Sequence, residues 1–249
     1  MTAPVAIFAA LPEERALLTA WLSEPRHLAL GDGADVEMGR LDGIEVVLAT
    51  SGIGKVAMAS RATQVLTRFA PRAVLFSGVA GGLDPSLEVG DVVVGDRLIQ
   101  HDAGVFGAAG LVPHQAGHLP FYDPSGRLGF EPDPRLLNRA LGALGDLELR
   151  EVEGRRPRIV TGTILTGDVF VDSTVERRRL RETFRAAAVE MEGAALAQVC
   201  ELFRTPCLVV RALSDLAGER APSPAVFARF VEVAAANGAM VVRRLLQVV

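Results

Sequence analysis

The chain has 249 residues, of which 49% are hydrophobic and 22% are charged, and its formal net charge is −4. This length and hydrophobic content suffice to bury one sizeable core, so we expect a single α/β domain over residues 1–249. The acidic balance, together with the lack of an arginine stripe interleaved with aromatic residues, argues against nucleic acid as a partner.

The N-terminal region and the thiols indicate the compartment. Residues Met1–Ala10 carry no basic segment ahead of their apolar run, and no apolar stretch reaches membrane-spanning length, which disfavours export and membrane insertion. Cys200 and Cys207 are too few for a disulfide framework and are not spaced with histidines as in a metal site. We therefore expect a cytoplasmic protein with two thiols buried as small hydrophobes, and neither a metal nor a cofactor.

Strand-like and helical patterns alternate in the N-terminal part. Proline at position 12 suits the first turn of a helix, and Asp42-Gly43 between two strand-like flanks is a strong hairpin signal. The expected elements are a strand over Val5–Ala9, a helix from Pro12 to Trp21, a hairpin over Val36–Thr50 and a helix from Lys55 to about Phe69.

Apolar strands separated by helices continue through the rest of the chain. We expect strands at Ala73–Phe76, Asp91–Val94, Ile159–Leu165, Ala187–Val189 and Cys207–Leu213, and helices near Thr174–Phe184, Gly193–Phe203 and Pro224–Val248. This pattern predicts a three-layer α/β fold with a central mixed sheet flanked by helices. The stretch Ala103–Pro134 is rich in Gly, Pro and His, and a loop of that length is usually a lid, a binding loop or an interface element.

Two carboxylates stand among apolar residues where a strand is expected to meet a helix. Glu190 and Glu192 lie within the apolar segment Ala187–Ala197. An unpaired ionised carboxylate in such a setting costs several kcal/mol, so each needs backbone N–H groups, an arginine or ligand hydroxyls as partners. A polyhydroxylated substrate would supply such hydroxyls. The alternative is a helix N-terminus that favours acidic residues in its first turn.

Glycine clusters and a polar strand end add two further candidates. Ser51–Gly54 and Ser77–Gly82 each follow a strand-like run, where glycine lets the backbone approach a ligand, but neither contains a dinucleotide or P-loop pattern. The strand that starts at Cys207 runs into Arg211, Ser214 and Asp215. Open α/β sheets place ligands at the carboxyl ends of strands, although aspartate also caps turns and helices very often.

Seven short motifs follow one another along the chain: Ser51–Lys55, Ser77–Gly82, Val89–Asp91, His101-Asp102, Thr166–Asp168, Val189–Glu192 and Arg211–Asp215. In this order and spacing they resemble the nucleoside phosphorylase and nucleosidase superfamily and, within it, the 5′-methylthioadenosine/S-adenosylhomocysteine nucleosidases. The resemblance extends from about Val5 to the last helix and weakens only across Ala103–Pro134.

The resemblance implies hydrolysis of the N-glycosidic bond of an adenine nucleoside, within nucleoside breakdown and methionine salvage. It implies that Asp215, held by Ser214, protonates N7 of adenine and thereby makes the base a neutral leaving group. It further implies that Glu14 holds and activates the attacking water, and that Glu192 binds the ribose hydroxyls. Arg211 is expected to tie Glu14, Glu192 and the water together electrostatically. Without the resemblance, Glu14 would be an exposed acid in a first helical turn.

The binding pocket follows from the same resemblance. Phe170 matches the aromatic residue that stacks on adenine, and the Val171 backbone matches the groups that read its edge. The other expected contacts lie around the sugar and its 5′ substituent: Ile53, Gly81, Glu190, Met191 and Phe227, with Leu11 in the pocket wall. The resemblance also implies a homodimer, in which the region around Ala103–Pro134 lies near the interface.

Departures from the family pattern leave alternatives open. Val79 stands where many nucleosidases have serine, Leu11 replaces a common methionine, and Ala103–Pro134 is longer than expected. One alternative is aminodeoxyfutalosine hydrolase, which shares the fold and the cleaved bond. A phosphorylase is disfavoured because the carboxylates Glu13 and Glu14 stand where phosphate would bind. A binding protein without catalysis would not need acids on both the water and the base sides.

Overall fold

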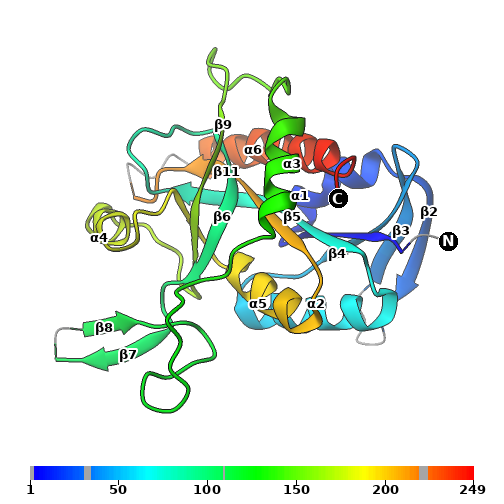
Figure 1. Ribbon diagram of the computed structural model, residues 1–249. Coiled ribbons are helices and arrows are strands. Elements are labelled where there is room, and N and C mark those ends of the chain that lie inside the picture. The colour runs from blue at the N-terminus through cyan, green and yellow to red at the C-terminus, as the bar shows by residue number, and fades with distance from the viewer. Residues whose placement is uncertain (1–2, 31–34, 109, 219–223) are drawn as a thin grey trace.

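The computed structural model describes residues 3–30, 35–108, 110–218 and 224–249, with the backbone alone for 224–229. Its elements, in chain order, are β1 (Val5–Ala9), α1 (Pro12–Ala20), β2 (Ser23–Ala29), β3 (Asp35–Leu41), β4 (Ile44–Thr50), α2 (Lys55–Phe69), β5 (Ala73–Gly82), β6 (Val92–Gln100), β7 (Gly104–Gly107), β8 (Gly110–Pro113), α3 (Pro134–Leu144), β9 (Ile159–Thr166), α4 (Thr174–Phe184), β10 (Ala188–Glu190), α5 (Gly193–Phe203), β11 (Cys207–Asp215) and α6 (Pro224–Leu245) (Figure 1).

Within the described ranges, nine strands form one mixed sheet in the order β10-β9-β6-β11-β5-β1-β4-β3-β2. Strands β4, β1, β5 and β11 are parallel neighbours, while β6 runs antiparallel to β11. The hairpin of β3 and β4 turns at Asp42-Gly43, and Asp42 takes the positive φ of 49° that such a tight turn requires. The expected mixed sheet is therefore confirmed.

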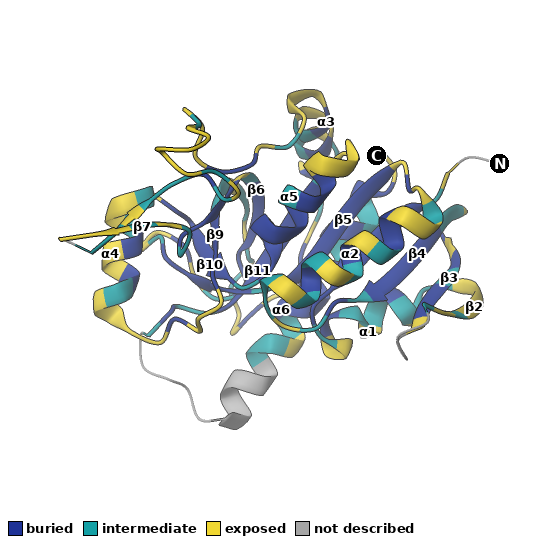
Figure 2. Cartoon of the chain, turned by 90° about the horizontal axis from the view of Figure 1, so that it is seen from below, coloured by how far each residue is buried: buried dark blue, intermediate teal, exposed yellow. Residues whose placement is uncertain are grey.

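Helices cover both faces of this sheet. Along β1, Ala6 and Phe8 face one core that includes residues of α2 and α5, whereas Val5 and Ile7 face a second core shared with α1, α3 and α6. This alternation follows from the two-residue period of a strand. Figure 1 shows α2 and α5 below the sheet and α3 and α6 above it, and Figure 2 shows that α2 exposes its outer side. The three-layer α/β fold is thus confirmed.

The strand pairing brings polar strand ends together. Gly81 of β5 pairs with Val189 of the antiparallel β10 and with Asp215 of the parallel β11. Glu190, at the end of β10, pairs with Thr166 at the end of β9. The carboxyl ends of β9, β10 and β11 therefore meet around one glycine-containing strand, which places Glu190 and Asp215 at the same edge of the sheet.

Several elements differ from those expected. Strand β5 extends beyond the expected Phe76 through the glycine-rich stretch Ser77–Gly82. Position 78 requires glycine, because a side chain there would collide with the Arg211 guanidinium. Strand β2 was not expected. It contains a proline, which is confined to edge strands within sheets, and it lies almost fully exposed at the edge of this sheet. The long segment after Ala103 forms the β7–β8 hairpin and leads to α3.

Helix α3 begins at Pro134 with Asp133 as its cap, and the Asp133 carboxylate accepts a hydrogen bond of 2.9 Å from the Leu136 amide.

No helix within the described ranges is long and apolar enough to cross a membrane.

Candidate active site

A cavity of about 280 Å³ opens at the carboxyl ends of β5, β10 and β11. Most of the site residues expected from the sequence line it: Glu14, Ile53, Gly81, Phe170, Val171, Glu190, Met191, Glu192, Ser214 and Asp215. Arg211 lies fully buried next to Glu190. Phe227 belongs to α6, but its side chain lies outside the described residues. Residues from distant parts of the sequence thus meet in one cavity.

Glu14 is held by the backbone around it. Its Oε2 accepts hydrogen bonds from the amides of Ala10, at 2.8 Å, and Leu11, at 2.9 Å. Its Oε1 accepts a third from the Val79 amide of β5 at 2.9 Å. The side chain is only 3% exposed, so the alternative of an exposed helical acid is wrong. Two of these amides belong to the turn into α1, where a glutamate at the third helical position can reach back to the cap.

Arg211 and two carboxylates form a buried ionic group. Its Nη2 donates a hydrogen bond to Glu190 and lies 3.4 Å from Glu192 Oε2. The guanidinium also stacks over the Phe76 ring, 3.8 Å from the ring centroid. Burial alone would lower the pKa of Arg211, but the neighbouring carboxylates raise it above its ordinary value. Among the described residues, no hydrogen bond joins Arg211 to Glu14, but the negative charge of Glu14 is one of the causes that raise the pKa of Arg211.

Glu190 is committed to the protein itself. Its carboxylate accepts hydrogen bonds from the Glu192 amide, at 3.0 Å, the Gly193 amide, at 2.8 and 2.9 Å, and the Thr166 hydroxyl, in addition to Arg211. These donors use most of its acceptor sites. Glu190 thereby orders the turn from β10 into α5 and fixes the direction of Glu192.

Glu192 is the more available of the two carboxylates. Its Oε1 accepts a hydrogen bond of 2.8 Å from the Gly54 amide, and it lines the cavity. Burial and the negative charge of Glu190 raise the pKa of Glu192 to about 7, despite the opposing effect of Arg211. The site therefore holds a carboxyl group that changes charge near neutral pH.

This shift predicts a pH-dependent stability. The folded pKa of about 7 exceeds the reference value of 4.5, so the unfolded chain ionises first as pH rises and the free energy of unfolding falls between these two values. Glu192→Gln should lack this contribution, because glutamine does not titrate. Urea unfolding at several pH values between 5 and 8 measures the free energy of unfolding of both proteins. The stability of the wild type relative to Glu192→Gln should fall as the pH rises from 5 to about 7 and stay constant above that. A pH-independent difference would contradict the prediction.

Asp215 also lines the cavity, at the end of β11. Its Oδ2 accepts a hydrogen bond of 2.9 Å from the Ser214 hydroxyl, and its Oδ1 accepts one of 2.8 Å from the Ala217 amide. An ideal Cβ at Gly81 would lie 3.0 Å from Asp215 Oδ1, so the glycine leaves room for this carboxylate. The two hydrogen bonds orient Asp215 while leaving acceptor sites for a ligand.

Apolar side chains form the remaining wall. Phe170 is 69% exposed and Ile53 is 58% exposed, although both are large hydrophobic residues that line the cavity. Val171, beside Phe170, is buried. Exposed apolar side chains beside a polar strand edge are typical of a site for a ligand with a flat apolar face.

Sequence analysis did not identify the groups that orient the acids. These are the amides of Ala10, Gly54 and Val79 and the Thr166 hydroxyl. Backbone amides carry no residue-specific signal, so their roles could not be read from the sequence. For Thr166 the sequence did offer a signal, because a hydroxyl residue stands at the end of an expected strand directly before a glycine.

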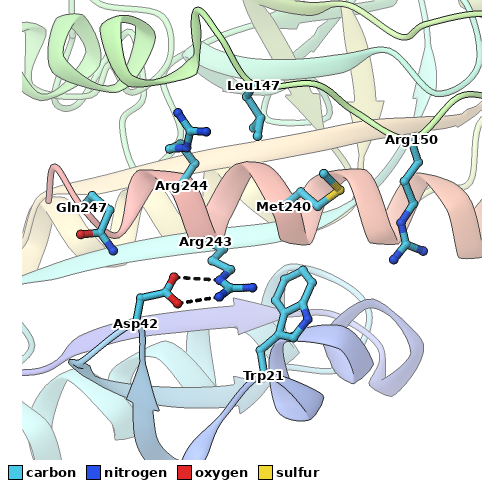
Figure 3. Close-up of a pocket in the computed structure, with 8 residues that line it drawn as sticks. All are labelled: Trp21, Asp42, Leu147, Arg150, Met240, Arg243, Arg244 and Gln247. Carbon is cyan, nitrogen blue, oxygen red and sulfur yellow. Dashed lines mark hydrogen bonds and ion pairs between the residues drawn. The ribbon is translucent and has the colours of Figure 1, made fainter.

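A second cavity, of about 370 Å³, lies between the ends of α1 and α6 (Figure 3). Three of its charged groups, Asp42, Arg243 and Arg244, have partners within the protein. Arg243 pairs with Asp42 at 2.5 and 2.7 Å and stacks over Trp21, and Arg244 pairs with Asp146 at 2.7 Å. Because this cavity contains none of the sequence motifs and no acid available as a catalyst, the smaller cavity is the candidate active site.

Comparisons with known proteins agree with this geometry. The family model described as "Phosphorylase superfamily" matches residues 4–247. The chain is 43% identical, over 100% of its length and 98% of the relative's, to a Mycobacterium bovis protein named 5′-methylthioadenosine/S-adenosylhomocysteine nucleosidase. A nucleosidase structure of that name from Colwellia psychrerythraea, in complex with adenine, has 35% identity and a TM-score of 0.83, with 99% and 96% of the two chains covered. A native futalosine hydrolase from Helicobacter pylori has 31% identity and a TM-score of 0.82, with 99% and 98% covered. The chain belongs to the phosphorylase superfamily.

Proposed function

We propose that this protein hydrolyses the N-glycosidic bond of 5′-methylthioadenosine and S-adenosylhomocysteine, releasing adenine and a 5-substituted ribose. The observation that carries the proposal is that Asp215, Glu14 and Glu192, which are distant in the sequence, all line one cavity. A nucleoside cleavage needs an acid at the base and carboxylates at the sugar and water. The nucleosidase relatives and the adenine complex support the same reaction.

The base side would be served by Asp215 and Phe170. Asp215 donates a proton to N7 of adenine as the glycosidic bond breaks, so that the base leaves as a neutral molecule. Ser214 and the Ala217 amide hold this carboxyl in place. Phe170 stacks on the base, an interaction that contributes about 1–3 kcal/mol in nucleic-acid systems.

The sugar side would be served by Glu192, Met191 and Arg211. Glu192 accepts hydrogen bonds from the ribose hydroxyls, with Met191 alongside. Positive charge develops on the ribose as the bond breaks, and nearby carboxylates stabilise it. Arg211 Nε and Nη1 are buried and have no hydrogen-bond partner among the described residues. A buried donor is costly unless paired, which supports a role in contacting water or substrate.

Glu14 would hold and activate the attacking water. Glu14→Gln is expected to lower kcat about 10²–10⁴-fold, because an amide is not a base and its NH₂ group cannot accept the backbone hydrogen bonds. The measurement is adenine release under saturating substrate. Glu13→Gln is the matched control, since Glu13 occupies the same helical turn and is exposed. Full activity of Glu14→Gln would show that the water is activated elsewhere.

The reaction itself is tested by incubating the purified protein with methylthioadenosine, with and without phosphate, and separating the products by chromatography. Free methylthioribose formed independently of phosphate supports a nucleosidase. A ribose 1-phosphate product formed only with phosphate would instead identify a phosphorylase. The futalosine hydrolase neighbour makes aminodeoxyfutalosine the second substrate to test. Faster cleavage of that nucleoside would favour the alternative function.

A homodimer is part of the proposal. Large apolar side chains lie exposed on α2, β7, α4, α5 and the segment after β8: Val56, Phe106, Phe121, Tyr122, Val175 and Leu202. The β7–β8 hairpin projects from the body of the molecule (Figure 1). Exposed apolar surface of this kind is typical of protein interfaces. Light scattering coupled to size-exclusion chromatography should give twice the chain mass of 26.4 kDa, and a monomer would contradict this part of the proposal.

We further propose that the reaction takes place in the cytoplasm, as a step of methionine salvage. Cys200 and Cys207 are both free thiols, Cys200 buried and Cys207 only half-buried, and free thiols suit a reducing compartment. Fractionation of the producing cells tests the location.

A further inference from the structure

Lys55, the only lysine in the chain, belongs to a charged cluster beside the cavity. Its Nζ lies 2.8 Å from Asp102 Oδ1 and 3.9 Å from Asp168 Oδ2. The Lys55 side chain is only 20% exposed. Burial would raise the pKa of Asp102, but hydrogen bonds from Lys55 and the Asp168 amide hold it below its ordinary value. Asp102 is therefore ionised at neutral pH.

Backbone hydrogen bonds connect the same residues. The Lys55 amide donates to Asp168 Oδ1 at 2.8 Å, and the Asp168 amide donates to Asp102 Oδ2 at 3.0 Å. Gly54 has a φ of +94°, and an ideal Cβ there would lie 3.0 Å from Asp168 Oδ1. Three segments that are distant in the sequence, the start of α2, the end of β6 and the end of β9, are thus joined at one point.

This junction continues into two walls of the cavity. Asp168 is followed directly by Val169, Phe170 and Val171, all of which line the cavity. On the other side, Ile53 lines the cavity, and the Gly54 amide holds Glu192. A displacement of Asp168 would therefore move the aromatic wall relative to the carboxylate that faces the sugar.

We propose that Lys55 is a positioning residue for the nucleoside base: through Asp102 and Asp168 it fixes the segment 168–171 against the start of α2. This inference rests on the proposed function, because it assigns the 168–171 segment to the base. Lys55 does not line the cavity, so it acts through the two aspartates and not by contact with the ligand. Its effect should fall on binding of the base and much less on the chemical step.

The test compares Lys55→Met with wild-type protein in adenine binding, by calorimetry, and in steady-state kinetics. We expect the Kd for adenine and the KM for methylthioadenosine to rise about tenfold, with kcat changed by less than about threefold. Lys55→Arg should recover most of the binding, since it keeps the charge and the donors. Arg68→Met, at the exposed far end of α2, is the matched control and should bind adenine like wild type.

Asp102→Asn removes the negative charge at this point but retains a hydrogen-bond acceptor, so it serves if Lys55→Met does not fold. The double variant with Lys55→Met should weaken adenine binding by less than the product of the two single effects, because both remove one contact. Additive effects, an unchanged Kd in Lys55→Met, or loss of kcat alone would overturn the inference. Failure of the proposed function would appear differently, as wild-type protein that releases no adenine.

Discussion

Asp215→Asn is expected to lower kcat for adenine release about 10²–10⁴-fold, the range that a general acid contributes. Asparagine is nearly isosteric, and its carbonyl oxygen can still accept the hydrogen bond that the Ala217 amide gives to Asp215. It has no proton to give to N7, so the adenine would have to leave as an anion. The variant should therefore remain folded and bind nucleoside while turning it over poorly.

An activated substrate separates this role from a general disturbance of the site. A 5-methylthioriboside of 4-nitrophenol has a leaving group that needs no protonation, so Asp215→Asn should cleave it at close to the wild-type rate. Asp146→Asn is the control, because Asp146 is exposed and lies at the second cavity's Arg244. Equal losses on both substrates would remove Asp215 as the acid, as would near-normal adenine release.

The core of the fold could be predicted because its signals are local. Strand β1 is a continuous apolar run, and proline at position 12 and Asp42-Gly43 mark a helix start and a hairpin turn. Strand β2 could not be predicted in the same way. Its residues are almost all exposed, it pairs with β3 at the sheet edge, and only Leu28 packs partly against the core. A strand that buries no face leaves no periodic pattern in its sequence.

The candidate site could be predicted in its residues more than in its connections. Glu14, Glu192 and Asp215 do meet at one cavity, as the resemblance implied. The partners of Glu14 are backbone amides, however, and the principal partner of Arg211 is Glu190 and not Glu14. Such details depend on how β5, β10 and β11 are paired, which is a property of the whole sheet. The catalytic roles themselves stay predictions.

The glycines of β5 are explained by groups from distant parts of the chain. Glycines at 78, 81 and 82 are typical of a turn when only neighbouring residues are considered. In the fold, each stands where another group approaches closely, the nearest being Arg211 at Gly78 and Asp215 at Gly81. At Gly81 the strand is paired on both sides, with Val189 of β10 and Asp215 of β11. Long-range packing, which the sequence does not display, therefore decides the conformation.

Arg211→Met is expected to reduce the free energy of unfolding by about 3–5 kcal/mol, the usual consequence of removing one member of a buried ion pair. Methionine can fill much of the space over Phe76, so the loss would arise from charge more than from packing. Glu190 and Glu192 would then face each other without a compensating cation. Urea unfolding measures the loss, and Arg211→Lys, which keeps the charge, should lose less.

The double variant Arg211→Met with Glu190→Gln shows whether charge is the cause. If it is, removing Glu190 as well should restore part of the stability, because only one buried carboxylate remains. The same reasoning predicts that Arg211→Met is less destabilised at pH 5 than at pH 8, since protonation neutralises a carboxyl whose pKa already lies at about 7 in the wild type. A pH-independent loss, or a double variant less stable than the single one, would instead assign Arg211 a packing role over Phe76 and Gly78.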